Sequence, residues 1–188
     1  RVYVGSGDHK VYCLNASTGA HIWNYTTGNY VHYSSPAVVD GRVYVGSGDH
    51  KVYCLNASTG AFIWSRTMDY VVLSSPAVVD GKVYVGSGSE EVYCFNASTG
   101  TTVWSYTTGG SVFSSPAVAD GKVYVGSYDN KVYCLNALNG AHIWDYTTGG
   151  YVWSSPAVAD GKVYVGSMDG KVYAFGDVDD VAITNITP

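Results

Sequence analysis

The chain has 188 residues, of which 13% are charged and 46% are hydrophobic, and its formal net charge is −5. This acidic balance excludes the basic footprint of a nucleic-acid-binding protein, and no apolar run approaches the ~20 residues of a membrane-spanning helix. The 23 glycines and 18 tyrosines combine turn formers with aromatic side chains, which favours an all-β protein.

A repeat of about 40 residues organises the sequence. The run RVYVGSGDHKVYCLNASTGA occupies residues 1–20 and returns letter for letter at residues 42–61. Looser copies start at Lys82, Lys122 and Lys162. A repeat of this length is typical of propellers and solenoids, in which each copy is one structural unit. Residues that recur in every copy therefore build the scaffold, and residues that differ are candidates for function.

Each complete copy is predicted to contain four short strands. In the second copy they are Ala37–Val39, Arg42–Gly46, Lys51–Leu55 and Ala61–Thr67. Asp40-Gly41, between the first two, is the favoured dipeptide of a two-residue hairpin. A tip at Asp49-His50 joins the second strand to the third, and a longer turn over residues 56–60 leads into the fourth. A connecting loop then leads to the next copy.

The second and third strands carry apolar or aromatic side chains on both faces. Val43 points to one side and Tyr44 to the other, because successive residues of a strand alternate. A sheet that is buried on both faces must lie between other sheets, so four-stranded antiparallel sheets at this period predict a β-propeller. A β-solenoid is the main alternative, but its coils are usually shorter and lack regular Asp-Gly hairpins.

The strand count predicts about four and a half blades over residues 1–176. The second and third strands occur five times, whereas the first and fourth occur four times. An open propeller exposes apolar faces and strand edges, so we expect either part of a 7- or 8-bladed ring or copies that complete one another. Residues 177–188 depart from the repeat and are predicted to form a linker and the start of a following module.

The cysteines occupy one place in four successive copies: Cys13, Cys54, Cys94 and Cys134. Equivalent positions of neighbouring copies should lie farther apart than the about 7 Å that a disulfide can bridge. No histidine or second cysteine lies beside them at metal-ligand spacing. We therefore predict buried free thiols that act as small hydrophobic side chains, and no metal site.

The unit V-Y-V-G-S-x-D-x-K-V-Y-x-L-N-A-x-T-G-x-x-x-W, best seen at Val43–Trp64 and Val123–Trp144, resembles the PQQ-like repeat of quinoprotein-type β-propellers. The resemblance covers residues 1–176, and Ala57–Trp64 is similar to the family's tryptophan-docking motif. It implies that each tryptophan packs on the neighbouring blade and bonds its indole N–H to backbone. The docking residues would be Trp23, Trp64, Trp104 and Trp144. The tail DVAITNITP resembles the start of the Ig-like modules that lie beside such propellers in archaeal cell-surface proteins.

Two branches of this family have different functions. Quinoprotein dehydrogenases bind pyrroloquinoline quinone beside a calcium ion, commonly under a disulfide between adjacent cysteines, whereas non-enzymatic members use their blades for contacts or scaffolding. The chain has no Cys-Cys pair, and no set of Asp, Glu and Asn departs from the repeat as a single calcium site would require. The resemblance therefore implies the non-enzymatic branch, without a cofactor.

No catalytic residue is predicted. The place of His21 and His142 holds Phe62 or Thr102 in other copies, which argues against chemistry there. Turn preferences explain the aspartates before Gly and at the hairpin tips, although calcium bound by turn aspartates stays an alternative. The Gly-Ser-Gly segments lead into strands and not into a helix N-terminus, so a nucleotide loop is not predicted.

Asparagine sequons that could carry glycans are frequent in the chain. They begin at Asn15, Asn24, Asn56, Asn96 and Asn185. Turn chemistry alone accounts for Asn and Ser or Thr at most of these places, but five sequons also fit a secreted or cell-surface protein. The turns that carry three of them should share one face of the propeller, which leaves clear the opposite face of connecting loops and hairpin tips.

The connecting loops differ most between copies, and the first is one residue longer. Aromatic side chains on a rigid scaffold suit protein or glycan contacts. The predicted binding residues are Tyr30, His32, Tyr70, Ser111, Tyr151 and Trp153 in these loops, with Tyr128 and Met168 at hairpin tips. The alternative is that loop valines and their aromatic neighbours plug the hub. Those valines would be Val31, Val71, Val112 and Val152.

The sequence favours a non-catalytic extracellular or cell-surface propeller that serves as an interaction or scaffold module. Its partner would be a protein or glycan on the loop face, with self-assembly as a further option. One alternative is a quinoprotein-type oxidoreductase fragment whose cofactor residues lie in blades outside this chain. Another is lectin-like binding, with one weak site per blade and avidity from repetition.

Overall fold

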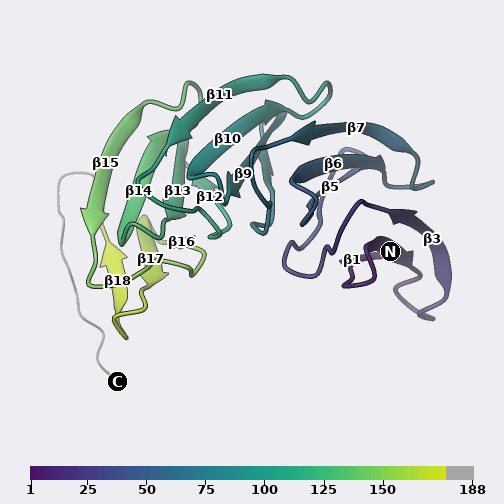
Figure 1. The fold of residues 1–188 in the computed structure, drawn as a ribbon, viewed down its shortest axis with the longest axis horizontal. Helices are drawn as coiled ribbons and strands as arrows, with labels where there is room; N and C mark the ends of the chain where they lie inside the picture. Colours follow the sequence, from purple (N-terminus) through teal and green to yellow (C-terminus); the bar gives the residue numbers. More distant parts are fainter. Residues whose placement is uncertain (177–188) are drawn as a thin grey trace.

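The computed structural model describes residues 1–176, which form five antiparallel sheets in an open arc (Figure 1). The first sheet contains β1 (Val2–Gly5), β2 (Lys10–Leu14) and β3 (His21–Thr26). The second contains β4 (Ala37–Val39), β5 (Arg42–Gly46), β6 (Lys51–Asn56) and β7 (Phe62–Thr67). The third contains β8 (Ala77–Val79), β9 (Lys82–Ser87), β10 (Glu91–Asn96) and β11 (Thr102–Thr107). The fourth contains β12 (Ala117–Ala119), β13 (Lys122–Gly126), β14 (Lys131–Asn136) and β15 (His142–Thr147), and the fifth contains β16 (Ala157–Ala159), β17 (Lys162–Gly166) and β18 (Val172–Phe175).

This arrangement confirms the predicted blades. Each complete sheet pairs its four strands in chain order, while within residues 1–176 the first sheet lacks the first strand of the repeat and the fifth lacks the last. The third strand of the second sheet is one residue longer than predicted, because Asn56 still pairs with Arg42. The fourth begins one residue later than predicted, since the carbonyl of Ala61 closes the preceding turn by accepting the Asn56 N–H.

The Asp-Gly hairpins have the predicted geometry. Asp40 and Gly41 have φ angles of 49° and 71°, and positive φ at both central residues defines a type I′ turn. Asp80, Asp120 and Asp160 repeat this conformation at 49–51°. The turn therefore explains the aspartates at these positions, because a short polar side chain permits the left-handed backbone conformation that the turn requires.

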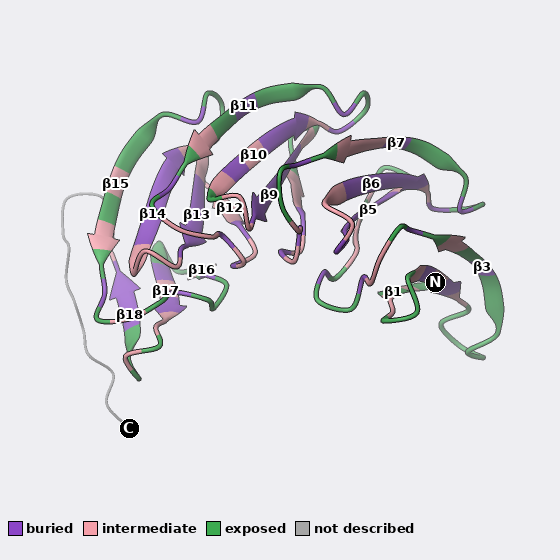
Figure 2. Cartoon of the chain, viewed as in Figure 1, coloured by how far each residue is buried: buried purple, intermediate pink, exposed green. Residues whose placement is uncertain are grey.

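The core lies between sheets, as the two-faced strands predict. Val43 and Val45 of β5 pack toward the first sheet with Val11, while Tyr44 and Cys54 belong to the cluster shared with the third sheet. Figure 2 shows the central strands largely buried and the outer strands largely exposed. Every interior blade is thus held on both sides.

All four cysteines are buried and free, as their spacing predicts. Burial raises the pKa of Cys54 and Cys134 to about 11 and the pKa of Cys94 to about 12. Thiols held protonated in this way behave as small apolar side chains, since the thiolate is the reactive form.

Tryptophans link each blade to the next. Their Nε1 atoms donate to the carbonyl of an alanine one copy later: Trp23 to Ala57 at 3.1 Å, Trp64 to Ala97 at 3.0 Å and Trp104 to Ala137 at 3.1 Å. Gly100 has a φ of 70°, and a Cβ there would lie 2.6 Å from Cδ2 of Trp64, so only glycine fits under the ring. Trp144 packs on the fifth sheet, with its ring centroid 5.3 Å from that of Phe175.

A ladder of serines joins the blades at the hub. The backbone N–H groups of Ser35 and Ser75 donate to the Oγ atoms of Ser75 and Ser115 at 2.8 Å, and Ser115 donates to Ser155 at 3.0 Å. These serines precede the inner strands β4, β8, β12 and β16, of which successive members are in contact. Each rung satisfies a backbone donor that the short inner strands do not pair.

The serine ladder predicts a modest stabilising role for the Ser75 hydroxyl. In Ser75→Ala the N–H of Ser35 loses its acceptor, so we expect the free energy of unfolding to fall by about 1 kcal/mol. Ser35→Ala is the matched control, because its hydroxyl accepts no N–H within residues 1–176. Urea unfolding of both variants checks this expectation, and equal losses would contradict it.

The remaining segment, residues 177–188, lies outside the described residues. The predicted linker and Ig-like start, together with the sequon at Asn185, therefore stay predictions. Within residues 1–176, no helix has the length and apolar character needed to cross a membrane.

Candidate functional site: the loop face

The two sides of the arc carry different turns. On one side, the N–H of Ala57 donates to the carbonyl of Gly41 at 2.8 Å and joins the turns before and after the central strands. On the other side, Gly48 of a hairpin tip donates to Tyr30 of a connecting loop at 2.9 Å. We call this second side the loop face. It comprises the connecting loops 27–36, 68–76, 108–116 and 148–156 and the hairpin tips 6–9, 47–50, 88–90, 127–130 and 167–171.

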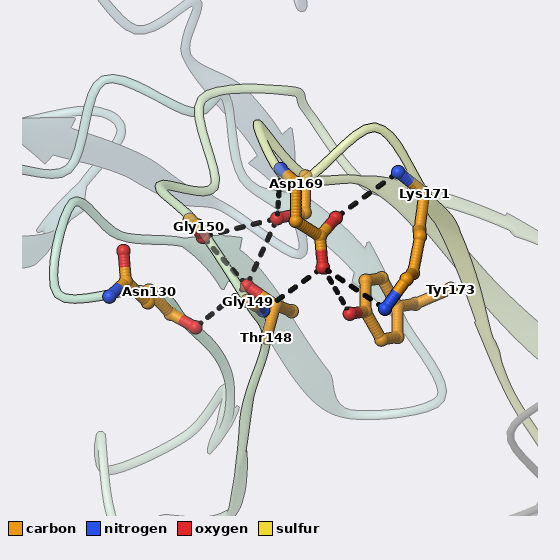
Figure 3. A network of polar contacts seen from close by, with 8 residues as sticks. Asn130, Thr148, Gly149, Gly150, Asp169, Lys171 and Tyr173 are labelled. Atoms are coloured by element: carbon orange, nitrogen blue, oxygen red, sulfur yellow. Dashed lines mark hydrogen bonds and ion pairs between the residues drawn. The ribbon is translucent and has the colours of Figure 1, made fainter.

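An aspartate at the hairpin tip fastens that tip to the connecting loop before it, as Figure 3 shows for Asp169. Its Oδ2 accepts hydrogen bonds from the Tyr173 hydroxyl at 2.5 Å and the Gly149 N–H at 3.0 Å. The Tyr173 hydrogen bond lowers the pKa of Asp169. The same pair of bonds occurs at Asp49 and Asp129. These carboxylates are therefore engaged in holding the blades together.

The third blade departs from this pattern and compensates. Ser89 replaces the tip aspartate, and the carboxylate of Glu91 instead accepts the Tyr93 hydroxyl. Burial, and to a lesser degree the bond to Glu91, raises the pKa of Tyr93 to about 12. The isolated Glu90-Glu91 change seen in the sequence thus preserves a structural contact by a different route.

The tip-to-loop contact predicts that Asp49→Asn destabilises the protein. The carboxylate of Asp49 accepts from both the Tyr53 hydroxyl and the Gly28 N–H. Both bonds reach Oδ2, and an amide oxygen in its place would carry no charge and accept both bonds more weakly. We therefore expect the free energy of unfolding to fall by about 2 kcal/mol. Chemical denaturation measures this loss. Asp8→Asn is the control and should lose less, because Asp8 bonds Tyr12 at an exposed site without a glycine N–H.

Valines of the connecting loops fill the inner end of each blade junction. Val31, Val72, Val112 and Val152 are at most 1% exposed. The prediction of Val71 for the second loop is wrong, because Val71 is only partly buried and Val72 takes the inner position. In the longer first loop, the buried Val31 lies three residues before Ser34. In the other loops the buried valine lies two residues before the equivalent serine, so counting from the first loop selects Val71 and not Val72.

The extra residue of the first loop creates a small aromatic group. The ring of His32 lies 4.0 Å from that of Tyr33 and 5.0 Å from that of Tyr30, measured between centroids. Tyr30 lies over the tip glycine Gly48, where a Cβ would approach its ring to 2.7 Å. Tyr33, which is not among the predicted binding residues, is 56% exposed.

The second and third connecting loops expose fewer aromatic side chains on the loop face. Tyr70 is half exposed, with its ring 5.6 Å from that of His50 and in contact with Gly88. Ser111 is partly buried, and its hydroxyl donates to the carbonyl of Gly88 at 2.9 Å. The predicted contact position at Ser111 is therefore occupied by an internal hydrogen bond.

Four aromatic residues from three segments meet at the fourth and fifth blades, and we call them the aromatic cluster: Phe113, Tyr128, Tyr151 and Trp153. Tyr128 stacks on Tyr151 at 4.9 Å with 6° between the rings. Its ring also lies 5.7 Å from Trp153 and 5.1 Å from Phe113, in both cases steeply inclined. Met168 adjoins the cluster, since its N–H donates to the carbonyl of Tyr151.

The aromatic cluster breaks the repeat. Tyr128 and Met168 occupy the tip position that is glycine in the first three blades, at Gly7, Gly48 and Gly88. Of the predicted binding residues, the structure brings Tyr128, Tyr151 and Trp153 together, whereas Tyr30 and His32 form the separate group in the first loop. Phe113 is not among the predicted binding residues, although it holds the same place before a serine as Trp153.

The described sequons lie away from the loop face. Asn15, Asn56 and Asn96 begin the turns between the third and fourth strands, where their Oδ1 atoms accept backbone N–H groups two and three residues later. Asn24 lies on the outer strand β3, with Nδ2 3.0 Å from Nε2 of His21. In residues 1–176, no group of three or more His, Cys, Asp and Glu is placed to hold a metal ion.

Radially stacked, four-stranded antiparallel sheets that repeat along the chain define a β-propeller. Residues 1–179 match the family model described as "Beta-alanine-activating enzyme, beta-propeller", and the chain belongs to that family. No match is found among the curated proteins.

Solved structures show the same fold at low sequence identity. BamB from Moraxella catarrhalis is similar with a TM-score of 0.83 and 22% identity, over 98% of this chain and 56% of that one. A quinohemoprotein alcohol dehydrogenase, ADHIIG from Pseudomonas putida HK5, gives 0.81 and 21%, over 99% and 40%. The computationally designed Ika8 protein gives 0.81 and 19%, over 90% and 53%. The chain therefore spans about half the length of these structures.

Proposed function

We propose that the chain is a non-catalytic interaction module that binds a macromolecular partner through its loop face. One observation carries the proposal: exposed aromatic side chains break an otherwise regular repeat, and they do so on this face. Tyr151 and Trp153 are 53% and 50% exposed. Aromatic residues on loops of a rigid scaffold are the usual anchors of protein interfaces.

The polar side chains at the hairpin tips favour a binding function over a catalytic one. Asp49, Asp129 and Asp169 each use a carboxylate oxygen to hold a tyrosine hydroxyl and a glycine N–H. A general acid or base must reach a substrate proton, whereas these oxygens are committed to the scaffold. The family description names an enzyme. We propose that the propeller part of such a protein makes contacts with a partner and does not carry out the reaction.

Site-specific photocrosslinking tests the proposed function. A benzophenone amino acid replaces Tyr151 on the loop face or, as the control, Leu138, which is 69% exposed in a turn of the opposite face. In the cells that produce the protein, we expect discrete adducts from position 151 and none from position 138. Equal adducts from both positions, or none from either, would contradict a loop-face partner.

Extracellular or cell-surface placement is the second part of the proposal. The sequons Asn15, Asn56 and Asn96 gather in the turns opposite the loop face, so glycans there would leave the aromatic residues accessible. Digestion of the native protein with an endoglycosidase should lower its mass by whole glycans. An unchanged mass in protein isolated from its own cells would remove this support.

A quinoprotein-type oxidoreductase is the second candidate, because the fold is shared with the quinohemoprotein alcohol dehydrogenase. Incubation with pyrroloquinoline quinone and calcium, followed by gel filtration, separates the two functions. We expect no quinone absorbance to travel with the protein and no alcohol-dependent dye reduction. Retained quinone with dye reduction would establish the oxidoreductase instead.

A further inference from the structure

We propose that a cavity between the second and third blades binds a small zwitterionic amino acid, with its carboxylate at Arg42 and its ammonium group at Asp40 and Asp80. The cavity lies on the side of the turns, opposite the loop face, so the inference does not depend on the proposed function. Its volume is about 300 Å³, at the lower end of the range for small-molecule sites.

The register of the second blade places Arg42 in a wall of this cavity. Arg42 begins β5 and lies on the same face as Tyr44, because alternate residues of a strand share a face. That face packs against the third blade, where the Tyr44 hydroxyl donates to the carbonyl of Ala97 at 3.1 Å. Arg42, Tyr44 and Ala97 all line the cavity. The guanidinium group is therefore held at a blade junction, and Arg42 is only partly exposed.

The Nε atom of Arg42 is a buried donor that lacks an acceptor. Within residues 1–176 it makes no hydrogen bond, and it is screened from solvent. A guanidinium group can donate but cannot accept, and it stays charged. Because an unpaired buried donor is unfavourable, this group selects a ligand with an acceptor. A carboxylate matches both the charge and the planar fork of the guanidinium.

This unpaired guanidinium group departs from the repeat. Arg1 holds the equivalent place in the first copy, and there its Nη1 donates to the carbonyl of Ala57 at 3.0 Å. The later copies have lysine at this place, at positions 82, 122 and 162. The second junction therefore differs from the first in its unpaired Nε and from the later ones in carrying a guanidinium.

Two carboxylates at the same cavity select the opposite charge. Asp40 and Asp80 occupy equivalent type I′ hairpins of the two blades, and both line the cavity. Neither side chain makes a hydrogen bond or an ion pair with another residue of the described chain. Ionised carboxylates only accept, whereas an ammonium group only donates. The pair therefore attracts an ammonium group and repels a simple anion.

A ligand that carries both charges fits this cavity better than a ligand with one. A simple acid would bind the guanidinium but would also face two carboxylates, and a simple amine would leave Nε of Arg42 unpaired. The walls also include Val39, Val78 and Val79, against which methylene groups can be buried. A short straight-chain ω-amino acid combines the carboxylate, the methylene groups and the ammonium group that these walls require.

Isothermal titration calorimetry on the full chain tests the proposal. The titrants are straight-chain ω-amino acids of two to six carbons, and the controls are the carboxylic acids and the amines of the same lengths. We expect saturable binding of one amino acid per chain. The matched acid and amine should bind at least about tenfold more weakly, because each leaves charged groups of the cavity unpaired.

Three variants locate the binding. Asp80→Asn keeps the hairpin, since Asn-Gly also favours a type I′ turn, and it should weaken the amino acid about tenfold while it strengthens binding of the simple acid. Arg42→Lys, which copies the residue of the later blades, should weaken the amino acid about tenfold because an ammonium group lacks the fork. Lys122→Gln changes the equivalent place of another junction and should leave the affinity unchanged.

Four results would overturn the proposal. They are no saturable binding of any amino acid, equal affinities for the amino acid and the acid, weaker binding of both in Asp80→Asn, and equal effects of Arg42→Lys and Lys122→Gln. Each of these results leaves the proposed function standing, because the crosslinking experiment probes the opposite face.

Discussion

Replacing Trp64 with alanine is expected to lower the free energy of unfolding by about 3–5 kcal/mol. The side chain is 6% exposed and lies between the rings of Tyr44 and Phe95. It covers Gly100 and donates its indole N–H to Ala97. Its removal therefore leaves a cavity at the junction of two blades, and the Ala97 carbonyl keeps only the Tyr44 hydroxyl as a donor. Urea denaturation monitored by circular dichroism measures the loss.

Two further variants show whether the loss of stability comes from the contacts of Trp64 between blades or from the removal of any tryptophan. Trp64→Phe keeps an aromatic ring but loses the N–H, so it should cost only about 1–2 kcal/mol. Trp153→Ala removes the same side chain from a half-exposed place, so its stability should stay within about 0.5 kcal/mol of the wild type. Similar losses for Trp64→Ala and Trp153→Ala would refute the docking explanation.

The sequence predicts the blades well because their determinants are local. Asp40-Gly41 specifies a type I′ hairpin through its own backbone preferences, and the alternation around Tyr44 requires a neighbour on each face. The first and second strands of the second blade have the predicted bounds for this reason. The ends of the third and fourth strands shift by one residue, since a hydrogen bond across the turn decides them.

The loop face could be predicted only in part. Periodicity shows which loops vary, but it does not show which side chain reaches the next hairpin tip. Val72 replaces the expected Val71 because an inserted residue in the first loop obscures the alignment of the loops. Phe113 joins Tyr128 only because a loop and the following tip become neighbours across a blade junction, and this is a tertiary contact.

Substitutions that look isolated in the sequence can also preserve a contact. Glu91 stands where other copies have lysine, and Ser89 stands where most have aspartate. In the structure the two changes belong together, because the carboxylate of Glu91 accepts the Tyr93 hydroxyl where other copies use the tip aspartate. The sequence of one repeat gives no sign that the acceptor has moved from the tip aspartate to Glu91. The tyrosine that recurs in every copy, Tyr93 in this one, indicates that an acceptor is still needed.

The second large expectation is that stability collapses in alkaline solution. The pKa of Cys54 and Cys134 is about 11 and that of Cys94 about 12 in the folded chain, against 9.0 for an unburied thiol. Because the folded pKa is raised, the contribution is fully present below pH 9 and is lost as pH rises through 11. Each pKa unit corresponds to about 1.4 kcal/mol, so ionisation of three buried thiols should lower the stability steeply over this pH range.

The triple variant Cys54→Ala, Cys94→Ala, Cys134→Ala tests this cause, and Ala174 already occupies the equivalent place in the fifth blade. At pH 7 we expect the variant to be less stable, because alanine fills less volume than cysteine. Between pH 8 and pH 10 its urea midpoint should stay nearly constant while that of the wild type falls. Parallel pH dependence of the two proteins would show that the thiols are not responsible. The tyrosines act only at higher pH, since burial raises the pKa of Tyr44 from 10.0 to about 12 and its contribution is lost above pH 10.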